Sequence, residues 1–240
     1  MSNGAGVLVV TGGSRGIGAA VCRLAGARGY DVVVNYASDE TAARRVVDEI
    51  TAAGGKAVAV RGDVSQEDDV ATLFETADAR GRLSGVVNNA GITGDKLSRL
   101  DEQDAKTVRR VLDVNVTGVF LCSQAAVRRM STRYGGHGGV IVNVSSTAAH
   151  RGSPNEWVHY AASKAAVETM THGLAEEVAG EGIRVNAVAP GMVETEVHAR
   201  AGAPDRLERV APLIPMGRAG QPEEIAEGIV WQRSDRKSVV

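Results

Sequence analysis

Short apolar runs alternate with longer amphipathic stretches along most of the chain. The runs are rich in β-branched residues and have the length of buried strands, while the stretches between them show the spacing of amphipathic helices. The expected strands are Val7–Val10, Asp31–Val34, Ala57–Val60, Gly85–Asn88, Val140–Val144 and Arg184–Val188. The expected helices cover residues 17–28, 39–53, 67–80, 101–133, about 157–179 and 222–231.

This order of elements predicts an α/β fold of the Rossmann type, in which a doubly wound parallel sheet carries helices on both faces. Ligands of such sheets bind beyond the carboxyl ends of the strands. The 240-residue chain has no linker rich in Pro, Gly or Ser and no internal repeat beyond the alternation itself. We therefore expect a single domain over residues 1–240.

Composition and charge narrow the classes of partner. Hydrophobic residues make up 43% of the chain and aromatic residues only 3%, so the core must be built from Val, Ala, Leu and Ile. The net charge of −2 and the pI near 6.2 argue against binding to nucleic acid or to an anionic membrane. No run approaches the ~20 apolar residues of a membrane span, and the first residues do not resemble a leader, so a cytoplasmic protein is expected.

The two cysteines, Cys22 and Cys122, lie in apolar helical patterns. They have no Cys-x-x-Cys spacing and no neighbouring His cluster, so we expect two small buried hydrophobes. Neither a disulfide nor a metal site is predicted.

A glycine-rich turn, Thr11-Gly-Gly-Ser-Arg-Gly-Ile-Gly18, joins the first strand to the first helix. At such a junction a pyrophosphate can meet unpaired N–H groups and the favourable end of the helix dipole. The spacing is G-x-x-x-G-x-G rather than the commoner G-x-G-x-x-G. An ordinary turn with a helix cap is the alternative interpretation.

Tyr160 and Lys164 lie four residues apart in Tyr-Ala-Ala-Ser-Lys, downstream of the pair Ser145-Ser146. Positions i and i+4 share one face of a helix, so the Lys164 ammonium is expected to stand beneath the Tyr160 phenol and, helped by a positively charged nicotinamide, to lower its pKa. In isolation, such a pair is more often a solvated helix face. Trp157 and His159 precede Tyr160 and are equally compatible with the substrate side or with the surface.

The glycine spacing, the tetrapeptide Asn88-Asn89-Ala90-Gly91 after the fourth strand and Tyr160-x-x-x-Lys164 together resemble the short-chain dehydrogenase/reductase family. The resemblance runs from residue 7 to about 231, and the overall look is similar to sugar dehydrogenases and 3-oxoacyl carrier protein reductases. It implies an enzyme that transfers hydride between a nicotinamide cofactor and a small-molecule carbonyl or alcohol. Homo-oligomeric assembly is implied as well.

The resemblance also assigns site residues. The implied catalytic set is Asn115, Ser146, Tyr160 and Lys164, with Ser146 preferred to Ser145. Tyr160 would exchange the proton, Ser146 would polarise the substrate oxygen, and Asn115 and Lys164 would hold a water chain. No metal is required for this chemistry.

The implied cofactor residues follow the dinucleotide from end to end. Those on the pyrophosphate and adenosine side are Gly12, Ser14, Arg15, Ile17 and Gly18, with Asp63 and Val64 at the adenine and Asn89, Ala90 and Gly91 at the adenosine ribose and the sheet. Those at the nicotinamide end are Tyr160, Lys164, Pro190, Gly191, Val193 and Thr195.

The end of the second strand bears on the choice between NAD and NADP. NAD-dependent proteins of this kind carry an acid there for the ribose 2′-hydroxyl, whereas this chain has Asn35-Tyr36-Ala37-Ser38. Arg15 offers a cation to a 2′-phosphate and Ser38 offers a hydroxyl, so NADP(H) is favoured over NAD(H). Asp39 lies close enough to reach a ribose, although a charge at a helix N-terminus is its favoured role.

Residues 194–215 and the last nine residues each have an unusual composition. Residues 194–215 are polar and contain three prolines, as in a mobile lid over the pocket. Residues 232–240 lack the apolar pattern of the edge strand that the family usually has, which predicts an altered end and weaker assembly. The competing function is a regulatory or structural nucleotide-binding protein without turnover.

Overall fold

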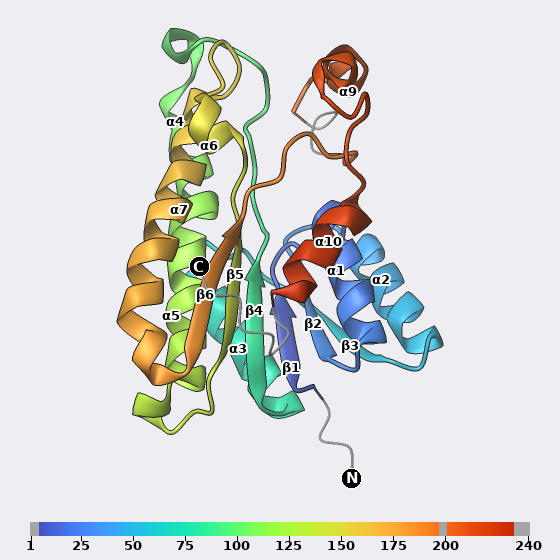
Figure 1. Cartoon of the computed structure of the whole chain (residues 1–240), viewed down its shortest axis with the longest axis vertical. Helices are drawn as coiled ribbons and strands as arrows, with labels where there is room; N and C mark the ends of the chain where they lie inside the picture. The colour runs from blue at the N-terminus through green and yellow to red at the C-terminus, as the bar shows by residue number, and fades with distance from the viewer. Residues whose placement is uncertain (1–4, 197–200, 233–240) are drawn as a thin grey trace.

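Six parallel strands form one sheet in the computed structural model, which describes residues 5–196 and 201–232 (Figure 1). The order across the sheet is β3-β2-β1-β4-β5-β6. The strands are β1 Val7–Val10, β2 Asp31–Tyr36, β3 Lys56–Arg61, β4 Leu83–Asn88, β5 Gly139–Val144 and β6 Ile183–Val188. The predicted α/β architecture is confirmed.

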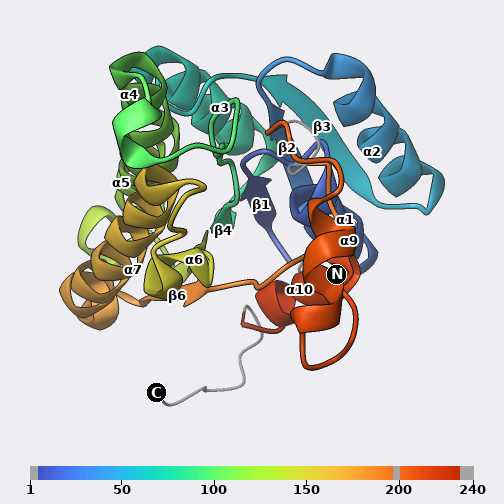
Figure 2. The same ribbon diagram turned by 90° about the horizontal axis from the view of Figure 1, so that it is seen from above.

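Helices cover both faces of the sheet (Figure 2). The face covered by α1, α2 and α10 buries Leu8 and Val10. The face covered by α3, α5 and α7 buries the alternate positions Val7 and Val9. The helices are α1 Gly16–Ala27, α2 Glu40–Ala52, α3 Glu67–Arg80, α4 Ala105–Leu112, α5 Gly118–Met130, α6 Ala148–Arg151, α7 Val158–Val178, α9 Arg206–Val210 and α10 Pro222–Trp231.

The site is positioned by the reversal of strand order at β1. β1 pairs with β2 on one side and with β4 on the other, and the chain leaves β1 and β4 toward opposite faces of the sheet. A crevice therefore opens beyond the carboxyl ends of β1 and β4, which is where ligands of doubly wound sheets bind. The turns at Gly12 and at Asn89 meet in this crevice.

The long helical region expected over residues 101–133 is shorter at both ends in the structure and is divided in its middle. Asp104 caps α4 by accepting from the Thr107 N–H at 2.8 Å, so the helix begins at Ala105. A π turn at Asp113–Thr117 separates α4 from α5, and the extended backbone of Ser131 ends α5 at Met130. A short 3₁₀ turn at Leu100–Glu102 precedes α4, and another at Thr132–Tyr134 follows α5.

Three other expectations are answered by the described residues. Both cysteines are buried and free, as predicted, and burial raises the pKa of each thiol, that of Cys122 to about 12. The described helices include none long and apolar enough to cross a membrane. Within the segment expected to be a lid, α9 and a 3₁₀ turn at Ala211–Leu213 are formed. Residues 197–200 of that segment and 233–240 of the unusual end lie outside the described residues.

Candidate active site

The glycine turn packs directly against the turn that follows β4. Gly12 has a φ of +61°, and a Cβ at that position would lie 3.0 Å from the Ala90 Cα. A Cβ on Gly18 would lie 2.3 Å from the Gly12 carbonyl oxygen and 2.5 Å from Asn89 Nδ2. Both positions therefore require glycine, and the bare backbone leaves the N-terminus of α1 open to a phosphate.

Buried polar side chains hold these two turns together. The Thr11 hydroxyl accepts from the Asn89 and Ala90 N–H groups at 3.0 Å each, and Asn89 Nδ2 donates to the Thr11 and Gly12 carbonyls, also at 3.0 Å. Asn35 at the end of β2 accepts from the Gly12 N–H at 3.2 Å. Asn89 is therefore a part of the turn's own scaffold.

Gly18→Ala is expected to damage cofactor binding and folding together. The new methyl overlaps backbone rather than a flexible side chain, so the turn must open, at a cost of about 1–3 kcal/mol or more. Thermal unfolding and cofactor titration measure the two effects. Gly29→Ala is a control with open space around the new methyl but a φ of +84°, so it isolates the strain of a positive φ. Equal effects of the two substitutions would contradict the packing argument.

Arg15 lies in a cleft of about 420 Å³ between the glycine turn and the segment after β6. It pairs with Asp39 and lies 3.5 Å from Glu196. Asp39 also caps α2, and the Ala42 N–H, followed by the Arg15 charge, holds the pKa of Asp39 below its usual value. Asp39 is thus both a helix cap and a partner of Arg15. Arg15 Nη1 is buried without a hydrogen-bond partner among the described residues.

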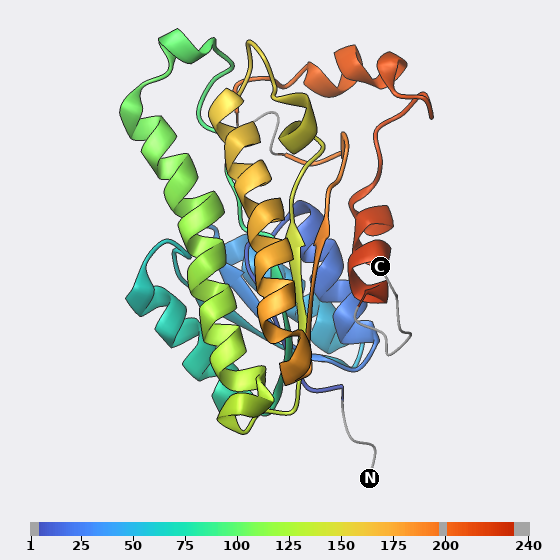
Figure 3. The same ribbon diagram turned by 60° about the vertical axis from the view of Figure 1, so that its left-hand side comes forward.

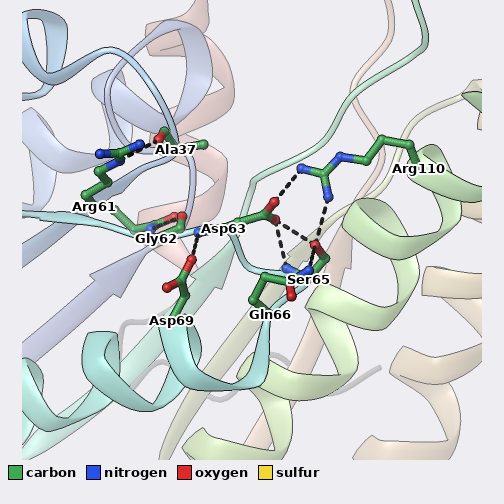
Figure 4. Close-up of polar contacts among 9 residues, drawn as sticks. Ala37, Arg61, Gly62, Asp63, Ser65, Gln66, Asp69 and Arg110 are labelled. Carbon is green, nitrogen blue, oxygen red and sulfur yellow. Dashed lines mark hydrogen bonds and ion pairs between the residues drawn. The ribbon is translucent and has the colours of Figure 1, made fainter.

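A second cleft, of about 470 Å³, lies at the ends of β2 and β3 and is lined by Ala37, Arg61, Gly62, Asp63 and Asp69. Figure 4 shows the Arg110 side chain reaching from α4 toward Asp63, with 2.5 Å between Nη2 and Oδ2. Burial works to raise the pKa of Asp63, but hydrogen bonds from Ser65 and Arg110 outweigh it and hold that pKa below the ordinary value. Asp63 thus faces the cleft as a carboxylate, and the neighbouring Val64 is buried.

Asn115 lies in the π turn between α4 and α5 and is fully buried. Its amide brackets Ile92, accepting from the Ile92 N–H and donating to the Ile92 carbonyl at 2.8 Å each. It also donates to the Ser163 hydroxyl at 3.0 Å. A single π turn inside a helix is frequent at functional sites, because it turns a residue out of the regular ladder.

Asn115 and Lys164 converge at Gly91. A Cβ on Gly91 would lie 3.4 Å from Asn115 Oδ1 and 3.4 Å from Lys164 Nζ. Lys164 is buried and donates to the Val144 carbonyl at 2.7 Å. Burial lowers the pKa of Lys164 to about 8, so the ammonium persists at neutral pH and is lost above that value.

The two serines after β5 have different surroundings. Ser145 is buried and donates to the Lys164 carbonyl and to Glu168, whose other oxygen lies 3.1 Å from His150. Ser146 accepts from the Ala148 N–H at 3.1 Å, and its hydroxyl works to lower the pKa of the nearby Tyr160 phenol. The preference for Ser146 over Ser145 stays a prediction.

The Tyr160 phenol differs from its expected state. Burial raises the pKa of Tyr160, and this outweighs the lowering effects of the Ser146 hydrogen bond and of the Arg206 positive charge. Lys164 Nζ is 5.7 Å from the Tyr160 ring centroid and donates to Val144 instead. In the protein alone desolvation is therefore the larger effect, and the lowering expected from Lys164 together with a positively charged nicotinamide stays a prediction.

The remaining residues assigned from the sequence have different surroundings. Thr195 lies against the glycine turn, since a Cβ on Gly16 would be 3.1 Å from its Cγ2. The Pro190 carbonyl accepts from the Thr147 N–H at 3.0 Å, and Val193 is buried and bridges to Gly220. Ser14 borders the Arg15 cleft, Ile17 packs against the core, and Gly191 and Ser38 are exposed.

The chain is similar to known proteins over nearly its whole length. A family model described as enoyl-(acyl carrier protein) reductase matches residues 12–240. The chain is 50% identical to the uncharacterized oxidoreductase YgfF of Escherichia coli (strain K12), over 98% of this chain and 95% of the relative. The chain belongs to the short-chain dehydrogenase/reductase family.

Other members of the short-chain dehydrogenase/reductase family agree in sequence and structure. The chain is 42% identical to a 3-oxoacyl-[acyl-carrier-protein] reductase of Synechocystis sp. (strain ATCC 27184 / PCC 6803 / Kazusa), covering 95% of this chain and 89% of the relative. A crystal structure of a dehydrogenase/reductase from Sinorhizobium meliloti 1021 superimposes with a TM-score of 0.90 at 32% identity, covering 100% of this chain and 92% of the other. Like its relatives, the protein is an NAD(P)-dependent oxidoreductase that acts on CH–OH or C=O groups.

Several residues that shape the site of this short-chain dehydrogenase/reductase were not identified from the sequence. Thr11 and Asn35 tie the glycine turn, and Arg110 reaches Asp63 from a distant helix. Trp157 and His159, which the sequence placed on the substrate side or at the surface, are both buried: Trp157 Nε1 donates to the Lys96 carbonyl, and His159 Nε2 lies 2.9 Å from the Thr93 carbonyl. These contacts join segments far apart in the chain, and no local pattern marks them.

Proposed function

We propose that this enzyme transfers hydride between NADP(H) and a small or medium-sized carbonyl or alcohol, with Tyr160 as general acid and base. One observation carries the proposal: Ser146, in the loop after β5, lies near enough to the phenol of Tyr160 on α7 to lower the pKa of Tyr160. Asn115 and Lys164 converge beside them at Gly91. This is the constellation needed to meet a substrate oxygen with two hydroxyl donors and to resupply the proton.

Tyr160 and Ser146 have separate roles in the proposed reaction. When bound, the nicotinamide supplies or accepts the hydride. Tyr160 donates its proton to the carbonyl oxygen in reduction, and the raised pKa of its phenol keeps that proton available at neutral pH. Ser146 accepts from the Ala148 N–H, so its own hydrogen can be donated either to the Tyr160 oxygen or to the substrate oxygen.

Lys164 binds the ribose and a water molecule of the proton path, and Asn115 fixes the loop beside that path. Donation to the Val144 carbonyl uses one Lys164 hydrogen, which leaves two for a ribose hydroxyl and a water molecule. The amide of Asn115 is fully engaged with Ile92 and Ser163, so its side chain fixes the loop after β4 beside that water path. Reduction of ketones with NADPH, and of NADP⁺ with the matching alcohols, tests the function; binding without turnover would favour an idle nucleotide-binding protein.

The preference for NADP(H) rests on Arg15. Its Nη1 is buried and makes no hydrogen bond in the part of the chain that the structure describes, where its partner is the Glu196 carboxylate at 3.5 Å, so a phosphate would have to compete with Glu196 for this atom. Gly12 and Gly18 provide a cradle that any side chain would fill. Asp39 competes for the same guanidinium, and we propose that it moderates the preference without reversing it.

Arg15→Ala is expected to weaken NADPH binding about 10- to 150-fold while NADH binding changes little, because a charge-assisted hydrogen bond contributes about 1.5–3 kcal/mol. Asp39→Asn should shift the preference the other way, since it removes the competing charge. Fluorescence titration with both cofactors measures the effects. Arg28→Ala, which breaks an exposed pair with Glu227, serves as the control. Equal losses for both cofactors would assign Arg15 to the pyrophosphate instead.

Assembly and location complete the proposal. We propose a cytoplasmic homo-oligomer, supported by the exposed side chains of Leu112 on α4 and Phe120 on α5, which are 39% and 53% exposed. Light scattering of the purified chain measures the mass. Among substrates, the named relative from Synechocystis favours an oxo group on an acyl chain as the first class to test.

A further inference from the structure

The loop that follows β4 is held differently in its two halves. The Asn89 N–H donates to the Thr11 hydroxyl at 3.0 Å, so the first half is tied to the glycine turn. Gly91 lies where the two halves meet and borders Lys164, since a Cβ on Gly91 would be 3.4 Å from Lys164 Nζ. The second half, residues 92–98, therefore begins beside the proposed catalytic groups.

The second half of the loop is bonded to the start of α7. The Ser98 N–H donates to the Glu156 carbonyl at 3.2 Å, and Trp157 Nε1 donates to the Lys96 carbonyl at 3.0 Å. Figure 3 shows the start of α7 at the same end of the molecule as α6 and α9. Because Tyr160 lies in the first turn of α7, one helix end holds both this half of the loop and the proposed acid.

His159 makes a third bond from α7 to the loop. The residue is only 5% exposed, and its Nε2 lies 2.9 Å from the Thr93 carbonyl oxygen. A carbonyl oxygen only accepts, so Nε2 carries the hydrogen of this bond. Nδ1 is buried and has no hydrogen-bond partner among the described residues, so the bond to Thr93 is the one that the ring makes there.

Gly94 packs directly against the same ring. It has a φ of +107°, and a Cβ at that position would lie 3.2 Å from His159 Nε2 and 3.1 Å from Thr107 Cγ2. The positive φ and the close contact both favour glycine, which lets the backbone approach the imidazole. His159 therefore fixes the loop at two successive residues, by a hydrogen bond to Thr93 and by packing against Gly94.

His159 acts on the loop and not on the reacting oxygen. Successive residues of an α-helix point about 100° apart, so His159 and Tyr160 face different surroundings. The loop, in contrast, lies near the reaction. Thr93 follows Gly91 by two residues, and two residues of chain span at most about 7 Å. The stretch that His159 holds therefore lies within about 7 Å of the residue that borders Lys164.

We propose that His159 is a positioning residue, which holds Thr93 and Gly94 as the wall that the body of the carbonyl substrate packs against. The inference rests on the proposed function. Because Thr11 and Asn89 hold the cofactor half of the loop separately, loss of the His159 bond should weaken substrate binding and spare NADPH binding. A histidine that only fills the core would show no such separation.

The test compares three substitutions of His159 with His172→Leu. His159→Leu fills space without a donor, His159→Gln brings an amide nitrogen about as far as Nε2, and His159→Asn brings one that is a bond shorter. His172 is an exposed residue of the same helix, so its substitution is the matched control. We expect His159→Leu and His159→Asn to lose the bond to Thr93, and His159→Gln to keep it.

Three measurements separate the proposed role from a general loss of structure. In folded His159→Leu and His159→Asn the KM for the carbonyl should rise about 5- to 30-fold, while kcat and the Kd for NADPH stay within about threefold, because the lost contact binds ground state and transition state alike. Amide hydrogen exchange over residues 92–98 should become about 5- to 150-fold faster, since a buried carbonyl has lost its donor. His159→Gln should recover most of the parent values.

Unchanged KM and unchanged exchange in folded His159→Leu would overturn the proposed role of His159, and so would the same effects in His172→Leu. Equal losses of kcat, NADPH affinity and substrate affinity would reduce His159 to a structural residue. If His159→Leu does not fold, His159→Gln and His159→Asn decide the question, and equal behaviour of these two would contradict the bond to Thr93. The exchange measurement needs no turnover, so a parent without carbonyl-dependent oxidation refutes the proposed function while exchange still decides whether His159 holds the loop.

Discussion

Tyr160→Phe is expected to lower turnover by about 10²- to 10⁴-fold while the affinity for NADPH stays within a few-fold of the parent. The substitution removes only the hydroxyl, and the ring keeps its place on α7. Steady-state kinetics and cofactor titration measure the two quantities separately. Because hydride transfer without a proton donor leaves an unprotected alkoxide, the loss should fall on kcat.

Tyr134→Phe is the matched control for this substitution. Tyr134 lies in a 3₁₀ turn after α5 and is 59% exposed, so loss of its hydroxyl should leave turnover unchanged. Substantial turnover in Tyr160→Phe would mean that another group protonates the substrate, and the assignment of Tyr160 would be withdrawn.

Lys164→Met should damage both cofactor binding and turnover, in contrast to Tyr160→Phe. The substitution keeps most of the apolar stem but removes the ammonium, whose charge-assisted contact with the ribose is expected to contribute about 1.5–3 kcal/mol, or about 10- to 150-fold in affinity. It also leaves the buried Val144 carbonyl without the donor that it has at 2.7 Å, which costs about 1–3 kcal/mol of stability. Cofactor titration, kcat and thermal unfolding are the measurements.

Lys106→Met provides the comparison, since Lys106 is an exposed lysine on α4. Lys164→Met with normal NADPH affinity would contradict the ribose contact and reduce Lys164 to a structural and electrostatic role. The pKa of Lys164 near 8 adds a dependence on pH: the ammonium is present at neutral pH and disappears above about 8, so cofactor binding should weaken as the pH rises through that value.

Local patterns were sufficient for the sheet and for the glycine turn. The β-branched runs near Val7–Val10 and Val140–Val144 become buried strands, and Gly12 and Gly18 occupy positions where no side chain fits. These features depend on period and on sterics within a few residues, which a sequence displays directly. The helix over 157–179 was placed almost to the residue for the same reason.

The features that the sequence did not reveal depend on contacts between residues far apart in the chain. The π turn that carries Asn115 interrupts an apolar pattern that favours a continuous helix, and it forms where the Asn115 amide brackets Ile92, 23 residues away. The pKa of Tyr160 in the protein alone likewise depends on burial by distant segments and on Arg206, 46 residues downstream, which the spacing of Tyr160 and Lys164 does not reveal.

The pairing of Asp39 with Arg15, which competes with a phosphate, is also a long-range contact. Asp39 was visible in the sequence as a helix cap, and that role is confirmed by its bond to the Ala42 N–H. That the other carboxylate oxygen reaches back to the glycine turn depends on how α2 packs beside α1. Cofactor preference therefore belongs to the relation between two elements and not to either motif.

The most direct test of the central claim is NADPH oxidation measured with a panel of oxoacyl thioesters, simple ketones and aldoses, in parallel for the parent and Tyr160→Phe. The account predicts carbonyl-dependent oxidation by the parent, a higher kcat/KM for NADPH than for NADH, and near-complete loss in Tyr160→Phe despite retained NADPH binding. Tight binding of NADPH by the parent without carbonyl-dependent oxidation, or equal rates in the two proteins, would contradict it.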